Sequence, residues 1–105
     1  MKAMKVVIYV PRPSADLLRQ VIGEAGGGEI GAYSYCSFSS VGTGRFRPEQ
    51  GSKPAIGTVG RTESVEEERI EFVCAHEMLQ KVVSAIRKVH PYEEPVIDAH
   101  DVEML

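Results

Sequence analysis

Residues 4–25 read MKVVIYVPRPSADLLRQVIGEA, and this stretch decides the fold class. Apart from Lys5, residues 4–10 are largely apolar and rich in β-branched side chains, and a Pro-Arg-Pro stop follows them, as is typical of a buried strand. Apolar side chains then recur at helical spacing from residue 17 onward and form one stripe. Ser14 is the predicted N-cap of this helix, and residues 26–28, three glycines, are its predicted C-terminal cap. The opening unit is therefore a strand followed by an amphipathic helix.

The rest of the chain repeats this unit in a different arrangement. We expect a second strand over residues 31–39 and a third over residues 63–74, with Ile70, Phe72 and Cys74 on the buried face. A second amphipathic helix is predicted over residues 77–89, and a last strand over residues 95–102. The order β-α-β-β-α-β predicts an α+β, ferredoxin-like split β-α-β fold, with an antiparallel sheet and both helices on one face.

Length and composition limit the classes of protein to which the chain can belong. Its 105 residues predict one domain, residues 1–105, and 43% hydrophobic with 26% charged residues exclude a disordered chain. Twelve Lys and Arg against fifteen Asp and Glu argue against binding to nucleic acid or to an anionic membrane. No apolar run approaches the ~20 residues of a membrane span, and no signal peptide is recognised, so we expect a cytoplasmic protein.

A long excursion is predicted between the second and third strands. Residues 40–61 are rich in glycine and proline, and the pieces 44–47 and 55–59 could pair there as a hairpin. The sheet face away from the helices is expected to be bare and to gather Tyr33, Tyr35 and Val73. An exposed apolar face of this kind predicts self-association, so we expect a homo-oligomer.

Residues 90–95, HPYEEP, hold the densest group of reactive side chains. His90 and Glu93 could ligate a divalent metal or act as a general acid and base. Two side chains are too few for a closed metal site, which would need His100 or a neighbouring subunit as well. The alternative is a rigid connection from helix to strand, in which His90 caps the helix and Tyr92 packs; we favour this interpretation.

Residues 42–48, GTGRFRP, place two guanidinium groups beside flexible backbone. Arginine binds phosphate and carboxylate well, so a small anionic ligand is one hypothesis, although the segment is not a P-loop. In the other hypothesis Phe46 packs across a subunit interface while Arg45 and Arg47 pair with acidic residues such as 66–68. We favour the interface.

Together, residues 33–38, residues 42–48 with 51–54 and 56–57, and residues 90–95 resemble the YqfO-type domain inserted in proteins of the Nif3-like (Ngg1p-interacting-factor-three) family. The closing turn is also similar to that of CutA-type proteins. The resemblance implies a PII/CutA-like domain that assembles as a trimer. In the larger relatives this domain sits on a separate di-metal domain, and nothing in this sequence corresponds to that second domain. We therefore expect the domain to stand alone. We assign none of the family's di-metal ligands to this sequence. The matching motif residues are Gly42, Thr43, Gly44, Arg45, Phe46, Arg47, Pro48, His90, Pro91, Tyr92, Glu93 and Glu94.

Three functions are weighed for such a domain. The leading hypothesis is a non-enzymatic trimer that acts as a regulatory or interaction module and binds a small ligand or a protein partner; it has no catalytic residue and needs no cofactor. The alternative is a CutA-like protein that binds a divalent metal through His90 and Glu93 at a subunit cleft. The third is a small enzyme with His90 as general base and Arg45 or Arg47 holding an anionic substrate.

Overall fold

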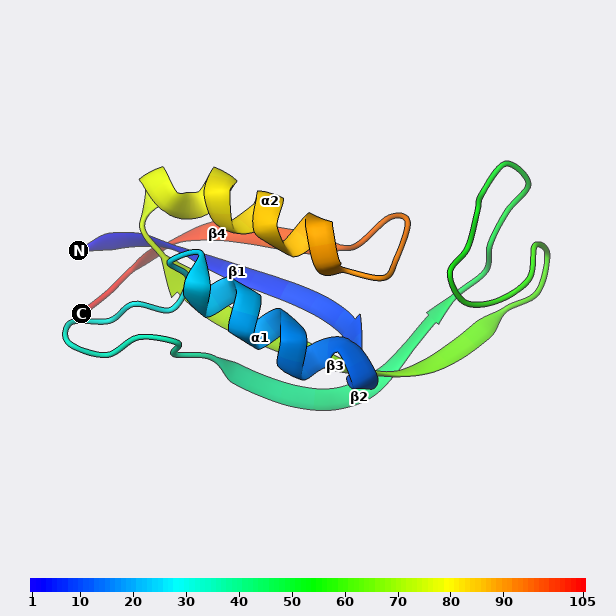
Figure 1. The fold of residues 1–105 in the computed structure, drawn as a ribbon, viewed down its shortest axis with the longest axis horizontal. Helices are drawn as coiled ribbons and strands as arrows, with labels where there is room; N and C mark the ends of the chain where they lie inside the picture. The colour runs from blue at the N-terminus through cyan, green and yellow to red at the C-terminus, as the bar shows by residue number, and fades with distance from the viewer.

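A computed structural model describes residues 1–105 and contains the predicted α+β, ferredoxin-like order of elements (Figure 1). Short 3-10 turns, η1 and η2, precede the two helices. In chain order the elements are β1 (Lys2–Pro11), η1 (Arg12–Ser14), α1 (Ala15–Glu24), β2 (Phe38–Phe46), β3 (Glu63–Cys74), η2 (His76–Met78), α2 (Leu79–Val89) and β4 (Ile97–Glu103).

The four strands form one antiparallel sheet in the order β2-β3-β1-β4. The central strands β1 and β3 pair with Val6 opposite Phe72 and Ile8 opposite Ile70. Both helices cover the same face of the sheet, while the loop between β2 and β3 extends away from both chain termini (Figure 1). No helix is long and apolar enough to cross a membrane.

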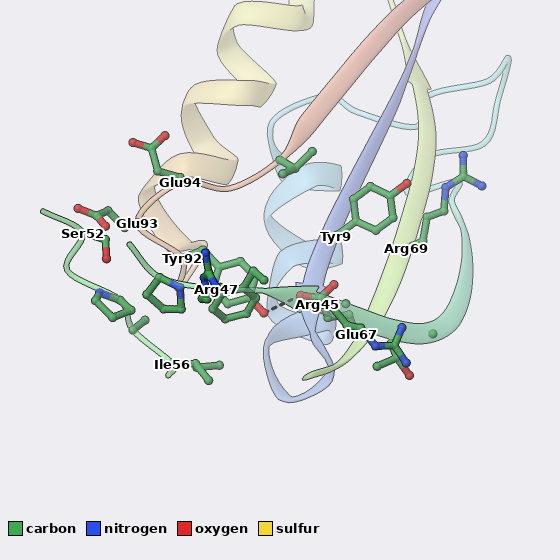
Figure 2. A pocket seen from close by; sticks show the side chains of 18 of the residues that line it. Tyr9, Arg45, Arg47, Ser52, Ile56, Glu67, Arg69, Tyr92, Glu93 and Glu94 are labelled. Carbon is green, nitrogen blue, oxygen red and sulfur yellow. Dashed lines mark hydrogen bonds between the residues drawn. The ribbon is translucent and has the colours of Figure 1, made fainter. Parts of the chain in front are cut away.

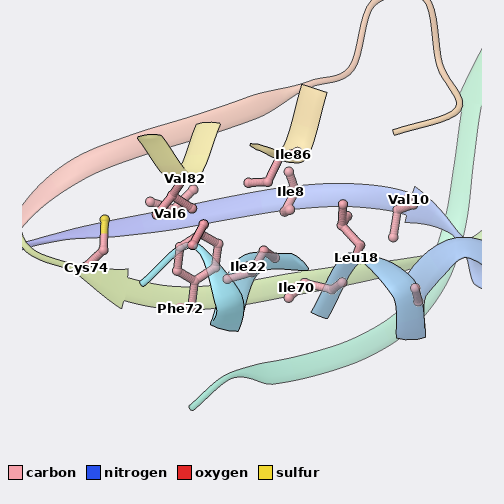
Figure 3. Packing of buried hydrophobic residues seen from close by; sticks show 12 residues of the cluster. Val6, Ile8, Val10, Leu18, Ile22, Ile70, Phe72, Cys74, Val82 and Ile86 are labelled. Atoms are coloured by element: carbon pink, nitrogen blue, oxygen red, sulfur yellow. The ribbon is translucent and has the colours of Figure 1, made fainter. Parts of the chain in front are cut away.

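The hydrophobic core lies between the central strands and the helices (Figure 3). It uses alternate residues of β1 and β3 because successive strand side chains point to opposite faces. The predicted buried face of β3 is confirmed. The cluster consists of Val6, Ile8, Val10, Ala15, Leu18, Ile22, Ala25, Ile70, Phe72, Cys74, Val82 and Ile86.

The predicted second strand over residues 31–39 is wrong, since β2 begins only at Phe38. The segment before it forms turns, and Tyr35 has a φ of 61°, which is incompatible with a strand. The Tyr35 ring lies against α1, where a Cβ at Gly23 would collide with it. Tyr33 and Tyr35 therefore do not belong to the open sheet face, which holds Val73 as predicted.

The open face nevertheless carries apolar side chains. Residues that alternate with the core positions place Val7 and Val73 there, both nearly buried, beside Phe38, which is 68% exposed. Lys5 and Glu71 lie among them. The face is thus partly apolar, with charged side chains interspersed.

The hairpin predicted within the excursion is also wrong. Residues 44–46 continue β2 and pair with β3, with Gly44 opposite Val65 and Arg45 opposite Ser64. The connection that remains, residues 47–62, contains no strand and is closed by a hydrogen bond of 2.8 Å from Gly60 N to Pro48 O. The longer pairing with β3 is favoured because it satisfies a continuous backbone ladder.

The predicted N-cap at Ser14 is not formed. Ser14 has helical φ and ψ, and its side chain makes no capping hydrogen bond. The chain instead enters α1 through the turn η1, which carries Pro13 and removes one orphan backbone donor. The helix α2 begins at Leu79, two residues later than predicted, because the 3-10 turn η2 precedes it.

We expect Gly28→Ala to destabilise the fold more than Gly31→Ala. Both glycines have positive φ, 80° and 56°, which costs a Cβ-bearing residue about 1–2 kcal/mol. A Cβ at Gly28 would also collide with the Cys36 backbone, whereas one at Gly31 meets open space. Urea unfolding of both variants measures the difference, and equal losses of unfolding free energy would contradict the packing of residues 28–36 described above.

Candidate functional site

A cavity of about 680 Å³ lies where β2 and the following loop meet the turn after α2 (Figure 2). Both predicted motif segments line it, although they are almost fifty residues apart in the chain. Residues 42–48 form one wall, and Tyr92, Glu93 and Glu94 form another. Of the predicted site residues only His90 and Pro91 do not line the cavity. Tertiary structure thus brings the two segments together around one concave site.

His90 lies behind the cavity wall and is 8% exposed. Its Nε2 donates to the carbonyl oxygen of Tyr9 at 2.8 Å, and its Nδ1 accepts the backbone N–H of Tyr92 at 3.1 Å. A neutral imidazole offers one donor and one acceptor, so both ring nitrogens are used within the chain. Pairing of β4 with β1 ends at Ile8, which leaves the Tyr9 carbonyl beyond the ladder for His90. His90 therefore joins the turn to the sheet through its ring, a contact that the sequence did not indicate, while its backbone occupies the C-cap position of α2.

Tyr92 is held over the cavity by His90, Phe46 and Glu67. Its hydroxyl donates a hydrogen bond of 2.6 Å to Glu67 Oε2 (Figure 2). Its ring meets Phe46 edge-on, with 5.7 Å between centroids, and lies 5.2 Å from the His90 ring. Burial, followed by the hydrogen bond to the negative Glu67, raises the pKa of Tyr92. The phenol therefore stays protonated and acts as a donor.

Within the chain, the two arginines do not pair with the acidic residues that were favoured from sequence, and the packing of Phe46 across a subunit interface stays a prediction. Phe46 packs on Tyr92 of the same chain. Arg47 pairs with Glu49 at 2.6 Å, and Arg45 is exposed without an ion pair. Pairing of Arg45 and Arg47 with residues 66–68 is therefore wrong. The register explains this, because Arg45 lies opposite Ser64 and beyond the acidic run.

Glu93 connects the turn to the loop after β2. Its Oε1 accepts the backbone N–H of Lys53 at 2.9 Å, a contact across forty residues of sequence. Glu94 lines the cavity but makes no hydrogen bond.

No group of three or more His, Cys, Asp or Glu side chains is arranged to hold a metal ion. His76, in the turn η2 before α2, contacts Asp101 at 2.9 Å between Nε2 and Oδ1.

Sequence reasoning missed several lining residues, above all Glu67. The acidic run 66–68 was interpreted as a solvated strand start, yet Glu67 is only 8% exposed. Strand alternation places it on the face away from the helices, but its burial depends on Tyr92, which is distant in sequence. The lining residues that were not predicted are Tyr9, Ser40, Val41, Glu49, Ser52, Pro54, Ala55, Ile56, Glu67, Arg69 and Val96.

The sequence is closely similar to part of longer bacterial proteins, although no family model matches it. It is 49% identical over 96 residues to a GTP cyclohydrolase 1 type 2 homolog of Halalkalibacterium halodurans, covering 91% of this chain and 26% of that protein. The corresponding protein of Bacillus subtilis is 46% identical over 99 residues, with 94% and 26% covered. The chain spans about a quarter of the length of these relatives.

Solved structures identify the matching part. The crystal structure of a Bacillus cereus protein related to NIF3 superposes with a TM-score of 0.85 at 41% identity, over 98% of this chain and 26% of that one. The chain is homologous to the PII/CutA-like domain inserted in the Nif3 family. The fold is also that of Archaeoglobus fulgidus CutA, with a TM-score of 0.69 at 19% identity over 99% of this chain and 86% of that one. Bacillus subtilis GlnK matches with a TM-score of 0.64 at 16% identity, over 97% and 86%.

Tyr92→Phe should destabilise this PII/CutA-like domain by about 1–3 kcal/mol near neutral pH, because the buried Glu67 carboxylate loses its partner. The raised pKa of Tyr92 adds a pH dependence. The stabilisation is complete below the unfolded tyrosine value of ~10 and is lost as pH rises through the higher folded value. Guanidinium unfolding across this range should show the alkaline loss in the parent and not in the variant. An identical pH dependence in both would contradict the assignment.

Glu93→Ala should loosen the loop against the turn. The amide of Lys53 loses its acceptor, and its hydrogen exchange should accelerate by about two- to tenfold. Glu94→Ala removes an equal charge from the neighbouring position without breaking a hydrogen bond, so it serves as the control. If exchange of the Lys53 amide accelerates equally in both variants, the effect comes from the loss of charge and not from the hydrogen bond of Glu93, which contradicts the prediction.

Proposed function

We propose that the chain is a non-enzymatic, trimeric regulatory module of PII/CutA-like type that binds a small anionic ligand in the cavity. The observation that carries the proposal is the convergence of residues 42–48 and 92–94 on one concave site. A volume of about 680 Å³ lies within the range of roughly 300–1,000 Å³ typical of small-molecule pockets. The cavity is built within residues 1–105, which we take to fold as one domain.

One unpaired arginine at the cavity supports a ligand that carries an acidic group. Arg45 lines the cavity and has no acidic partner, so its guanidinium fork is free to bind a carboxylate or phosphate. The glycine at position 42, where a Cβ would meet open space, leaves the adjacent backbone accessible. A ligand with one acidic group therefore finds a donor in this wall without displacing an existing ion pair.

The internal hydrogen bonds of His90 and Tyr92 support a binding role over catalysis by these two side chains. Both nitrogens of His90 are occupied, and the Tyr92 phenol is held protonated against Glu67. The same occupancy weakens the metal-binding alternative, since ligation by His90 requires a hydrogen bond to break. Glu93, its proposed partner ligand, already accepts from the Lys53 backbone.

The open sheet face supports assembly. Phe38, which is 68% exposed on this face, is an apolar side chain that association would cover. A trimer is the arrangement that the resemblance to PII/CutA-like domains implies. In that assembly the module would convert ligand binding at the cavity into a signal for a protein partner.

Native mass spectrometry of the freshly purified protein tests the proposal. The expected result is a trimer that retains a small anionic molecule. Arg45→Ala should lower its affinity by about tenfold or more, the loss of one charge-assisted hydrogen bond. Arg61→Ala is the matched control, because Arg61 is exposed in the same loop but does not line the cavity. A monomer at micromolar concentration, or equal losses in both variants, would overturn the proposal.

A further inference from the structure

Glu67 differs from the other glutamates of its strand. Glu66 pairs with Arg12, Glu68 with Arg19 at 2.5 Å, and Glu71 with Arg69 at 2.7 Å. Glu63, at the start of the strand, has no ion pair either but is only partly buried. Glu67 is the most buried of the five, at 8% exposed, and it forms no ion pair. Its one hydrogen-bond partner is a neutral hydroxyl, that of Tyr92.

Several residues of the cavity wall pack against the Glu67 carboxylate. Oε2 accepts from Tyr92, while Oε1 has no partner within the chain. Opposite Oε1 stands Gly44, where a Cβ would collide with the carboxylate. Tyr92 and Phe46, whose rings pack edge-on, also line the cavity and contribute aromatic carbon. Glu67 therefore presents free acceptor capacity to the cavity in a largely apolar setting.

A buried carboxylate without a cation is costly, and a positively charged N–H donor offsets that cost most effectively. We propose that Glu67 is the specificity-determining acceptor for a cationic nitrogen group, a guanidinium or an ammonium, of the cavity's ligand. This inference rests on the proposed function, which places an acidic group of the ligand at Arg45. The ligand class is then a small zwitterion that carries both groups.

L-Arginine is the probe, because it carries a guanidinium for Glu67 and a carboxylate for Arg45. Citrulline replaces the guanidinium by an uncharged urea group of nearly the same shape. Isothermal titration should show saturable binding of arginine to the wild-type protein, with citrulline weaker by about ten- to a hundredfold, the worth of a charge-assisted hydrogen bond.

Glu67→Gln should abolish this preference while retaining an acceptor for the Tyr92 hydroxyl, so the fold is preserved. Glu94→Gln is the matched control: it removes a second carboxylate from the cavity lining and should keep the preference. Equal binding of arginine and citrulline, an unchanged preference in Glu67→Gln, or no saturable binding of arginine would each overturn the inference.

The experiments distinguish a failure of the proposed function from a failure of the role assigned to Glu67. A retained anionic molecule that is lost in Arg45→Ala but kept in Glu67→Gln would support the proposed function and overturn the role of Glu67. Failure of both, with no retained molecule and no binding of arginine, would reject the cavity as a ligand site.

Discussion

The antiparallel pairing of β1 with β3 is the constraint on which the rest of the structure depends. It places Val6 and Ile8 beside Phe72 and Ile70, and both helices pack on the apolar surface that these residues make. In the same register the end of β1 pairs with the acidic residues of β3, with Pro11 opposite Glu67. The sheet wall of the cavity is therefore a consequence of the pairing that also builds the core.

A short polar network extends that constraint to the turn after α2. A buried imidazole is unfavourable unless both nitrogens are satisfied, and Tyr9 O with Tyr92 N supply the two partners. Holding His90 also holds Tyr92, whose hydroxyl then reaches Glu67 on β3. Three elements that are far apart in the chain are thereby joined on one side of the cavity.

Some charged side chains stabilise the fold through ion pairs, whereas others line the cavity without an ion pair. Arg19 is held by hydrogen bonds to Glu68 and Asp16, which raise its pKa, and it anchors α1 to β3. Arg45 and Glu67, in contrast, have no countercharge although they line the same cavity. Glu93 and Glu94 also line the cavity without an ion pair, but both are exposed to solvent, whereas Glu67 is buried. The proposals above assign Arg45 and Glu67 to a ligand.

The sequence by itself determined the fold class, because hydrophobic periodicity over residues 4–25 and 63–89 distinguishes strands from helices locally. It also indicated both motif segments of the site. It misplaced the second strand, since residues 33–38 alternate like a strand while Tyr35 adopts a left-handed turn against Gly23. Only the tertiary structure decided that Tyr92 meets Glu67 and that Arg45 stands unpaired. Those outcomes depend on strand register and on long-range contacts, which a local pattern does not encode.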